Sequence, residues 1–189
     1  MRLVLSTVLG GLVLFGWGAF SHMVLGLEKD AVKMIQNEAP VVAAMKSNIT
    51  EPGVYFTPGM DMTKQATTEE MNAWAAKYHE GPTAMIVYNP TGADVFTPHQ
   101  FGMQLGADLL AAFFGSVILM LGATTFSRGV VISMLIGMAG WCAILIPYWN
   151  WYRFPFAFIR MDLVDQMAGW FIAGFVMAFF MRRREPKAA

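Results

Sequence analysis

The chain has 189 residues, of which 56% are hydrophobic and 14% charged, whereas an average soluble domain has about 45–50% and about 25%. Its 13 basic and 13 acidic side chains cancel, so no net charge points to nucleic acid as a partner. The single cysteine, Cys142, excludes an intramolecular disulfide and a cysteine-cluster metal site. Because the charges avoid several long apolar runs, we expect an integral membrane protein in contact with the lipid bilayer.

The first apolar run follows Arg2 and covers residues 3–25. About 20 apolar residues span the hydrocarbon core of a bilayer, so the run is long enough for a membrane helix. A cleaved signal peptide is the alternative, but the best cleavage site, Ala19-Phe20-Ser21, is crowded by Trp17. We therefore predict an uncleaved first membrane helix within residues 1–26.

Residues 27–100 have the composition of a soluble domain and form the predicted cap. The pattern predicts short helices over residues 28–36 and 38–47, the second with Asn37 as its N-cap. Strands are predicted over residues 53–57 and 83–88, on either side of a helix over residues 68–79. Such a cap of ~75 residues is marginal as an independent domain, so we expect it to rest on the membrane helices.

Residues 101–189 hold three further apolar runs and a basic tail. They predict membrane helices over residues 102–123, 130–148 and 161–181, the second of them ending at Pro147. Between the last two lies an aromatic stretch, residues 148–165, which we interpret as a tight outer turn. Its aromatic side chains, together with Trp17, are predicted to form a belt at the membrane interface: Trp149, Trp151 and Tyr152.

The predicted fold class is mainly α, a four-helix transmembrane bundle with a small α+β extracytoplasmic cap between helices 1 and 2. Basic residues at the helix ends set the orientation, because cytoplasmic loops carry an excess of Lys and Arg. Six of them share one side: Arg2, Arg128, Arg182, Arg183, Arg184 and Lys187. Both termini are therefore predicted to be cytoplasmic and residues 27–100 to be external.

Small residues recur four positions apart in the predicted membrane helices. Examples are Gly102 with Gly106, Ser133 with Gly137, and Gly169 with Ala173. In lipid, helices associate through close packing of such residues. The pattern predicts a compact bundle, or close contact with another membrane protein or a second copy of the chain.

Three acids lie within the predicted spans: Asp108, Asp162 and Asp165. A charged side chain in hydrocarbon is costly unless it is paired, so each is a candidate for function. The structural alternative is that Asp162 and Asp165 stabilise a helix N-terminus through its dipole and that Asp108 pairs across the bundle. We expect Asp108 to face the bundle, and its candidate partners are Arg153, Arg160 and His22.

A metal site is a further alternative with little support in the spacing. His22, His99 and Asp108 could meet near the outer surface, but no His-x-x-x-His or His-x-His motif is present. Met60 and Met62 form one Met-x-Met pair, a soft donor set for Cu(I). No haem motif, phosphate loop or nucleophile motif occurs, so no cofactor is predicted and an enzyme is the class favoured least.

Four stretches, GWGAFSHMVL, GVYFTP, GPTAMIVYNP and WNWYRFP, together resemble a group of small bacterial membrane proteins with four helices. The resemblance covers most of the chain, implies a bacterial inner membrane, and brings no functional residues with it. The layout, with a large first outer loop, is also similar to that of claudins. The claudin loop's cysteine pair is missing, so this second likeness concerns architecture alone.

The sequence thus leads to three functional hypotheses. The first is an accessory or structural membrane protein that binds a larger membrane complex or itself. The second is a carrier of a small ligand or ion that uses the outer acids. The third is metal handling on the external side.

Overall fold

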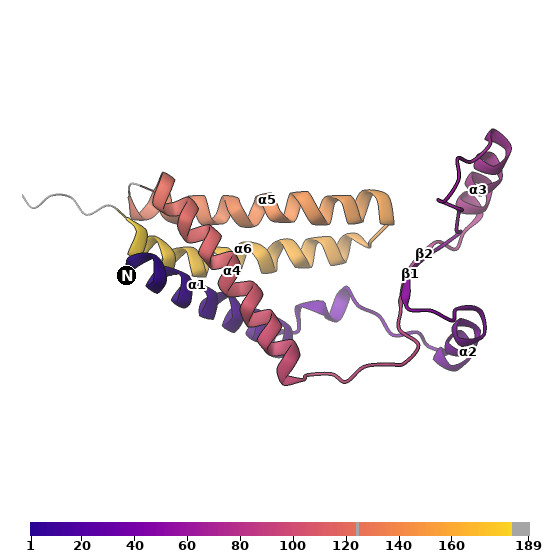
Figure 1. Cartoon of the computed structure of the whole chain (residues 1–189), viewed down its shortest axis with the longest axis horizontal. Coiled ribbons are helices and arrows are strands. Elements are labelled where there is room, and N and C mark those ends of the chain that lie inside the picture. The colour runs from indigo at the N-terminus through magenta and orange to yellow at the C-terminus, as the bar shows by residue number, and fades with distance from the viewer. Residues whose placement is uncertain (124, 183–189) are drawn as a thin grey trace, which may run out of the picture. The chain divides into compact units, whose positions relative to one another are not determined.

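The computed structural model describes residues 1–123 and 125–182. It is mainly helical and contains one small sheet of two strands. The chain divides into two compact units, one formed by residues Met1–Lys33 and Phe96–Ala189 and the other by Met34–Val95. Figure 1 labels the helices and strands of both units.

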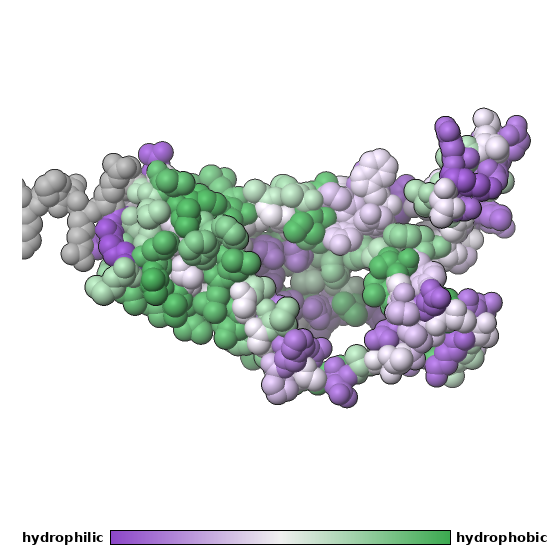
Figure 2. Space-filling model, in the orientation of Figure 1, coloured by the Kyte–Doolittle hydropathy of each residue, from purple (hydrophilic) through white to green (hydrophobic). Residues whose placement is uncertain are grey.

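The first unit contains four long apolar helices (Figure 1). They are α1 (Arg2–Ala19), which the π-helix η1 (Phe20–Leu25) continues, α4 (Pro98–Gly122), α5 (Phe126–Tyr152) and α6 (Phe156–Met181). Each is long and apolar enough to cross a membrane. Figure 2 shows hydrophobic residues over the visible face of these helices. The structure therefore confirms that the four predicted apolar runs form helices.

Two predicted boundaries between α5 and α6 are wrong: the end of α5 at Pro147, and the start of α6 at residue 161, since α6 begins at Phe156. Pro147 does not end α5, which continues to Tyr152. Proline is tolerated within membrane helices because neighbouring groups satisfy the freed carbonyl. Arg153 ends the helix in the left-handed conformation, at φ 59°, and the Phe154 N–H donates to the Tyr148 carbonyl over 3.2 Å. The predicted aromatic turn is therefore mostly helical, and only residues 153–155 connect the two helices.

The four helices pack through small residues. α1 contacts α4 and α6, and α5 lies against α6 (Figure 1). A Cβ added at Gly129 would lie 2.7 Å from the Ala178 Cβ, and one added at Gly174 would lie 2.5 Å from the Ser133 Cβ. Ser6 and Ser116 share a buried hydrogen bond of 2.7 Å between α1 and α4. Such contacts replace the hydrophobic effect as the source of helix association in lipid.

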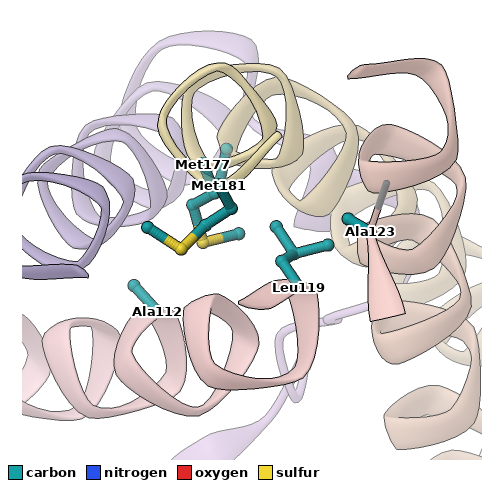
Figure 3. Packing of buried hydrophobic residues seen from close by; sticks show 6 residues of the cluster. Ala112, Leu119, Ala123, Met177 and Met181 are labelled. Carbon is teal, nitrogen blue, oxygen red and sulfur yellow. The ribbon is translucent and has the colours of Figure 1, made fainter. Parts of the chain in front are cut away.

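A cluster of small and flexible apolar side chains fills the space between α4 and α6. Figure 3 shows Leu119 of α4 turned toward Met177 and Met181 of α6. The cluster consists of Ala112, Leu119, Ala123, Ala173, Met177 and Met181. Methionine fills irregular gaps well, which accounts for two of the sixteen methionines in the chain.

The second unit contains α2 (Glu38–Asn48), β1 (Gly53–Thr57), α3 (Thr68–Glu80) and β2 (Ala84–Tyr88). The strands are antiparallel, with Tyr55 opposite Ile86. Thr67 and Glu70 form a capping box that begins α3. Both strands and this helix agree with the prediction to within one residue at each end.

The helix predicted over residues 28–36 is absent from the structure. Only a 3-10 turn, η2 (Leu27–Asp30), forms there, after Gly26 at φ 59°. The apolar residues Val32, Met34 and Ile35 of this segment are 60%, 93% and 53% exposed, so they give a helix here no buried face. A short helix without a buried face is not stable in water. Asn37 does precede α2, but its side chain makes no capping hydrogen bond.

Candidate ligand cavity between α1, α4 and α6

Three of the four long helices enclose a cavity of about 570 Å³. Its wall includes aromatic side chains from α1, α4 and α6, among them Phe15, Phe101 and Trp170. Its polar side chains come from the same helices and from η1: His22, Gln104, Asp108, Asp162, Asp165 and Gln166. The volume is within the usual range of small-molecule sites, about 300–1,000 Å³.

The π-helix η1 brings His22 into this cavity. Its turn is closed by a bond from the Gly26 N–H to the Ser21 carbonyl, five residues back. π-turns are rare and occur frequently at functional sites. Gly26 then reverses the chain in the left-handed conformation at φ 59°. This reversal places Glu28 beside His22, with 2.9 Å between Oε1 and Nδ1.

Asp165 is the central acceptor of the cavity. The Trp17 Nε1–H donates to its Oδ1 over 2.8 Å and approaches its backbone carbonyl at 3.1 Å. His22 Nε2 lies 3.5 Å from its other carboxylate oxygen, Oδ2. Gly169, one turn further along α6, makes room for the indole, since a Cβ there would lie 2.9 Å from Trp17 Cδ1. Trp17, Asp165, His22 and Glu28 therefore form one polar chain.

The imidazole of His22 lies between two carboxylates. Carboxylate oxygens face both ring nitrogens, Glu28 at Nδ1 and Asp165 at Nε2. The polar chain thus places the imidazole of His22 between the carboxylates of Glu28 and Asp165.

Asp108 and Asp162 are less well satisfied than Asp165. Within the described part of the chain, Asp108 accepts only from its own helix, where Gln104 Nε2 lies 3.2 Å from each of its carboxylate oxygens. The Oδ2 atom of Asp162 is buried and has no hydrogen-bond partner among the described residues. Buried polar groups are normally paired, so these two carboxylates have acceptor capacity left for a ligand.

The structure separates the predicted site residues into two groups. Asp108, Asp162, Asp165 and His22 line the same cavity. Arg153, Arg160 and His99 are exposed and are not part of its wall. In the described part of the chain, no ion pair joins either arginine to an acid, so the expected pairing of Asp108 with them does not form.

The helix-dipole interpretation of the α6 acids is wrong. α6 begins at Phe156, so Asp162 and Asp165 are its seventh and tenth residues, and its first turn contains no acid. The dipole effect is confined to the first turn of a helix. These carboxylates therefore lie within the apolar helix without that compensation.

The remaining predicted residues lie apart from the cavity. Trp149, Trp151 and Tyr152 are 47%, 72% and 44% exposed at the end of α5, as residues of an interface belt would be. Met60 lines a small groove of the second unit, and Met62 is 84% exposed. Among the described residues, no group of three or more His, Cys, Asp or Glu side chains could hold a metal ion.

Two cavity residues, Trp17 and Gln104, and the His22 partner Glu28 were not predicted from the sequence as part of the site. Trp17 was assigned to the interface belt, whereas its indole N–H binds Asp165. Gln104 precedes Asp108 by four residues, and this i,i+4 spacing could have revealed the contact. Glu28 could not have been found, because its position depends on the turn at Gly26.

Comparisons with protein families, curated proteins and solved structures found no match for this chain. The geometry of the cavity therefore carries the functional argument.

Proposed function

We propose that the chain is an integral protein of a bacterial inner membrane whose α1–α4–α6 cavity binds a small organic cation. The supporting observation is the excess of carboxylates in the cavity wall. Asp108, Asp162 and Asp165 line it, and among the described residues His22 is the only basic side chain in its wall. In this proposal, both termini are cytoplasmic and residues 27–100 are external.

An organic ammonium group would satisfy what the wall leaves open. It supplies hydrogen-bond donors and positive charge to Asp162 Oδ2, which lacks a partner among the described residues. It would also complement Asp108, whose single donor among the residues that the structure describes is the amide of Gln104. A carboxylate is costly in the interior of a membrane protein unless it is paired, so binding a cation lowers that cost.

The aromatic part of the wall favours an organic cation over a bare ion. Trp17, Trp170, Phe15 and Phe101 all border the cavity. Aromatic faces attract cations and also bury the apolar part of a ligand. The volume of about 570 Å³ is much larger than an inorganic ion requires.

The test is a binding titration on the purified full chain in detergent. Trp17 and Trp170 line the cavity, so their fluorescence reports occupancy. We expect saturable changes with a panel of primary and quaternary ammonium compounds. Asp162→Asn should weaken the best of them about tenfold or more, because a charge-assisted hydrogen bond contributes roughly 1.5–3 kcal/mol.

Asp94→Asn is the matched control, since Asp94 is exposed and belongs to the other unit. It should bind like the unmodified chain. Absence of saturation for every compound, or equal affinities in the Asp162 and Asp94 variants, would refute cation binding in this cavity.

A second candidate function, an accessory subunit or homo-oligomer, has a separate supporting observation. Gly102 and Gly106 lie four residues apart on α4, and a Cβ at either would meet no atom within 4 Å. Pairs of glycines with this spacing let a second helix approach closely. The glycines at other helix contacts, such as Gly129 and Gly174, are already used within the chain.

Mass measurement after gentle detergent extraction tests this second candidate. We expect a complex larger than one chain, and Gly106→Leu should dissociate it. Gly140→Leu is the control, because Gly140 also faces open space but has no glycine partner four residues away. A free monomer, or equal effects of the two variants, would exclude an interface at Gly102 and Gly106.

A further inference from the structure

Three arginines gather at the end of the first unit that lies far from His22 along α1. Arg2 donates to the Phe180 carbonyl over 2.6 Å and also to the Arg182 carbonyl. The Arg182 guanidinium lies 4.9 Å from the centre of the Phe179 ring. Arg128 lies in the same region. Its neighbour Gly129 packs on Ala178 of α6, and the Ala178 carbonyl accepts from the Arg182 N–H. We call Arg2, Arg128 and Arg182 the basic end.

No carboxylate of the described residues neutralises this basic end. Among the described residues, the acids nearest in sequence to Arg128 and Arg182 are Asp108 on α4 and Asp165 on α6, both of which line the cavity near His22. None of the ion pairs in the described part includes Arg2, Arg128 or Arg182. The side chain of Arg128 is exposed, and the hydrogen bond at this residue comes from its backbone N–H.

An apolar groove of about 320 Å³ lies between α5 and α6 beside these charges. Its walls are Phe126, Phe175, Val176, Phe179 and Phe180. Phe126 and Phe175 meet edge to face at 4.7 Å between ring centres, and Phe179 and Phe180 do so at 5.3 Å. The wall residue Phe179 is also the ring over which Arg182 stacks, so the groove and the basic end share a residue.

We propose that this groove and the basic end together bind one anionic phospholipid. An acyl chain lies along the aromatic side chains, and the headgroup phosphate is held by Arg128 and Arg182. Guanidinium groups bind phosphate oxygens through paired, charge-assisted hydrogen bonds. Basic pockets at the ends of membrane helices are a recurrent form of anionic lipid site.

Charge complementarity selects this occupant over a second copy of the chain. The described faces around the groove carry unpaired positive charge, so a second basic end would be repelled. A zwitterionic lipid would fill the groove but would not need the arginines. The proposal is independent of cation binding, because the cavity and the basic end share no residue.

Native mass spectrometry of the full chain tests the site. The protein is extracted, exchanged into mixed micelles with equal amounts of phosphatidylglycerol and phosphatidylcholine, and the retained lipids are counted. We expect retention of phosphatidylglycerol to exceed that of phosphatidylcholine at least about fivefold. Arg128→Gln should reduce this preference to near unity without unfolding the chain, because the Arg128 side chain is exposed and forms no hydrogen bond or ion pair among the described residues.

Two further variants distinguish the parts of the site. Arg160→Gln, near the other end of α6, is the control and should keep the preference. Val176→Trp should fill the groove and reduce retention of both lipids. Equal retention of the two lipids by the unmodified chain, or equal losses in the Arg128 and Arg160 variants, would overturn the proposal. Phosphatidylglycerol-independent dimers that Val176→Trp disrupts would show a second copy in the groove instead.

Discussion

Glycines determine where the tryptophans of the cavity wall lie. Trp17 lies over Gly169 and reaches Asp165, and Trp170 lies against Gly115 and Gly137. A Cβ at Gly137 would come within 2.6 Å of Trp170 Cδ1. Close packing leaves no space for such a group unless the aromatic ring moves.

Two glycines of α5 therefore predict opposite outcomes for the same substitution. Gly137→Ala should lower the free energy of unfolding by roughly 1–3 kcal/mol, as overpacking does. Gly140→Ala should be neutral or stabilising, because open space surrounds Gly140 and alanine favours a helix. Thermal unfolding in detergent measures both, and a lower melting temperature for the Gly140 variant than for the Gly137 variant would contradict this account.

At the scale of elements, the apolar runs predicted the four long helices, but their ends required tertiary context. The aromatic and charged residues after Pro147 resemble a turn, yet they continue α5 and begin α6. Such residues are compatible with a helix that extends past the hydrocarbon core. By contrast, β1 lies between Pro52 and Pro58, so local chemistry sets its limits and the prediction agreed with the structure.

The N-terminus of α3 should weaken in acid. The hydrogen bond from Lys64, followed by that from the Thr67 backbone, lowers the pKa of Glu70 from its ordinary value of 4.5. A carboxylate with a lowered pKa stabilises the folded state above its ordinary pKa, and the contribution is lost as the pH falls through the lowered value. NMR chemical shifts of residues 68–71 should therefore move away from helical values below about pH 4.5.

Glu70→Gln supplies the control for this titration. Glutamine can still accept the capping hydrogen bond but does not ionise, so the same shifts should change less with pH. Asp61 is a second acid with a lowered pKa, because it accepts hydrogen bonds from Thr63. The Glu70→Gln variant keeps Asp61. An identical pH profile in both proteins would assign the effect to Asp61 or to another group.

At the scale of the whole molecule, sequence reasoning identified the cavity acids but not their partners. Depth along a helix can be read from the number of residues, and it places Asp108, Asp162, Asp165 and His22 at similar levels; in the structure all four line one cavity. Direction around a helix could not be read without its neighbours. Arg160 is only two residues from Asp162, but a helix turns by about 200° over that distance, so the two side chains point apart.

The proposed orientation can be tested on the intact chain. A reporter fused after Ala189 should be active only as a cytoplasmic fusion, and one inserted between residues 63 and 68 only as an external fusion. The reason is the concentration of basic residues at one side of the helices, which sets topology. The reverse pattern of activities would exclude the model with both termini in the cytoplasm.

The contacts of α1 also imply an order of assembly. Its side-chain hydrogen bonds to other helices join residues 110 to 180 positions apart, including Ser6 with Ser116, Trp17 with Asp165 and Arg2 with Arg182. At a synthesis rate of about 5–20 residues per second, α1 waits roughly 7–30 seconds for Asp165 to be made. α1 thus completes its contacts only after α6 has been made. A chain that stops before α6 leaves the Trp17 indole without its acceptor, Asp165.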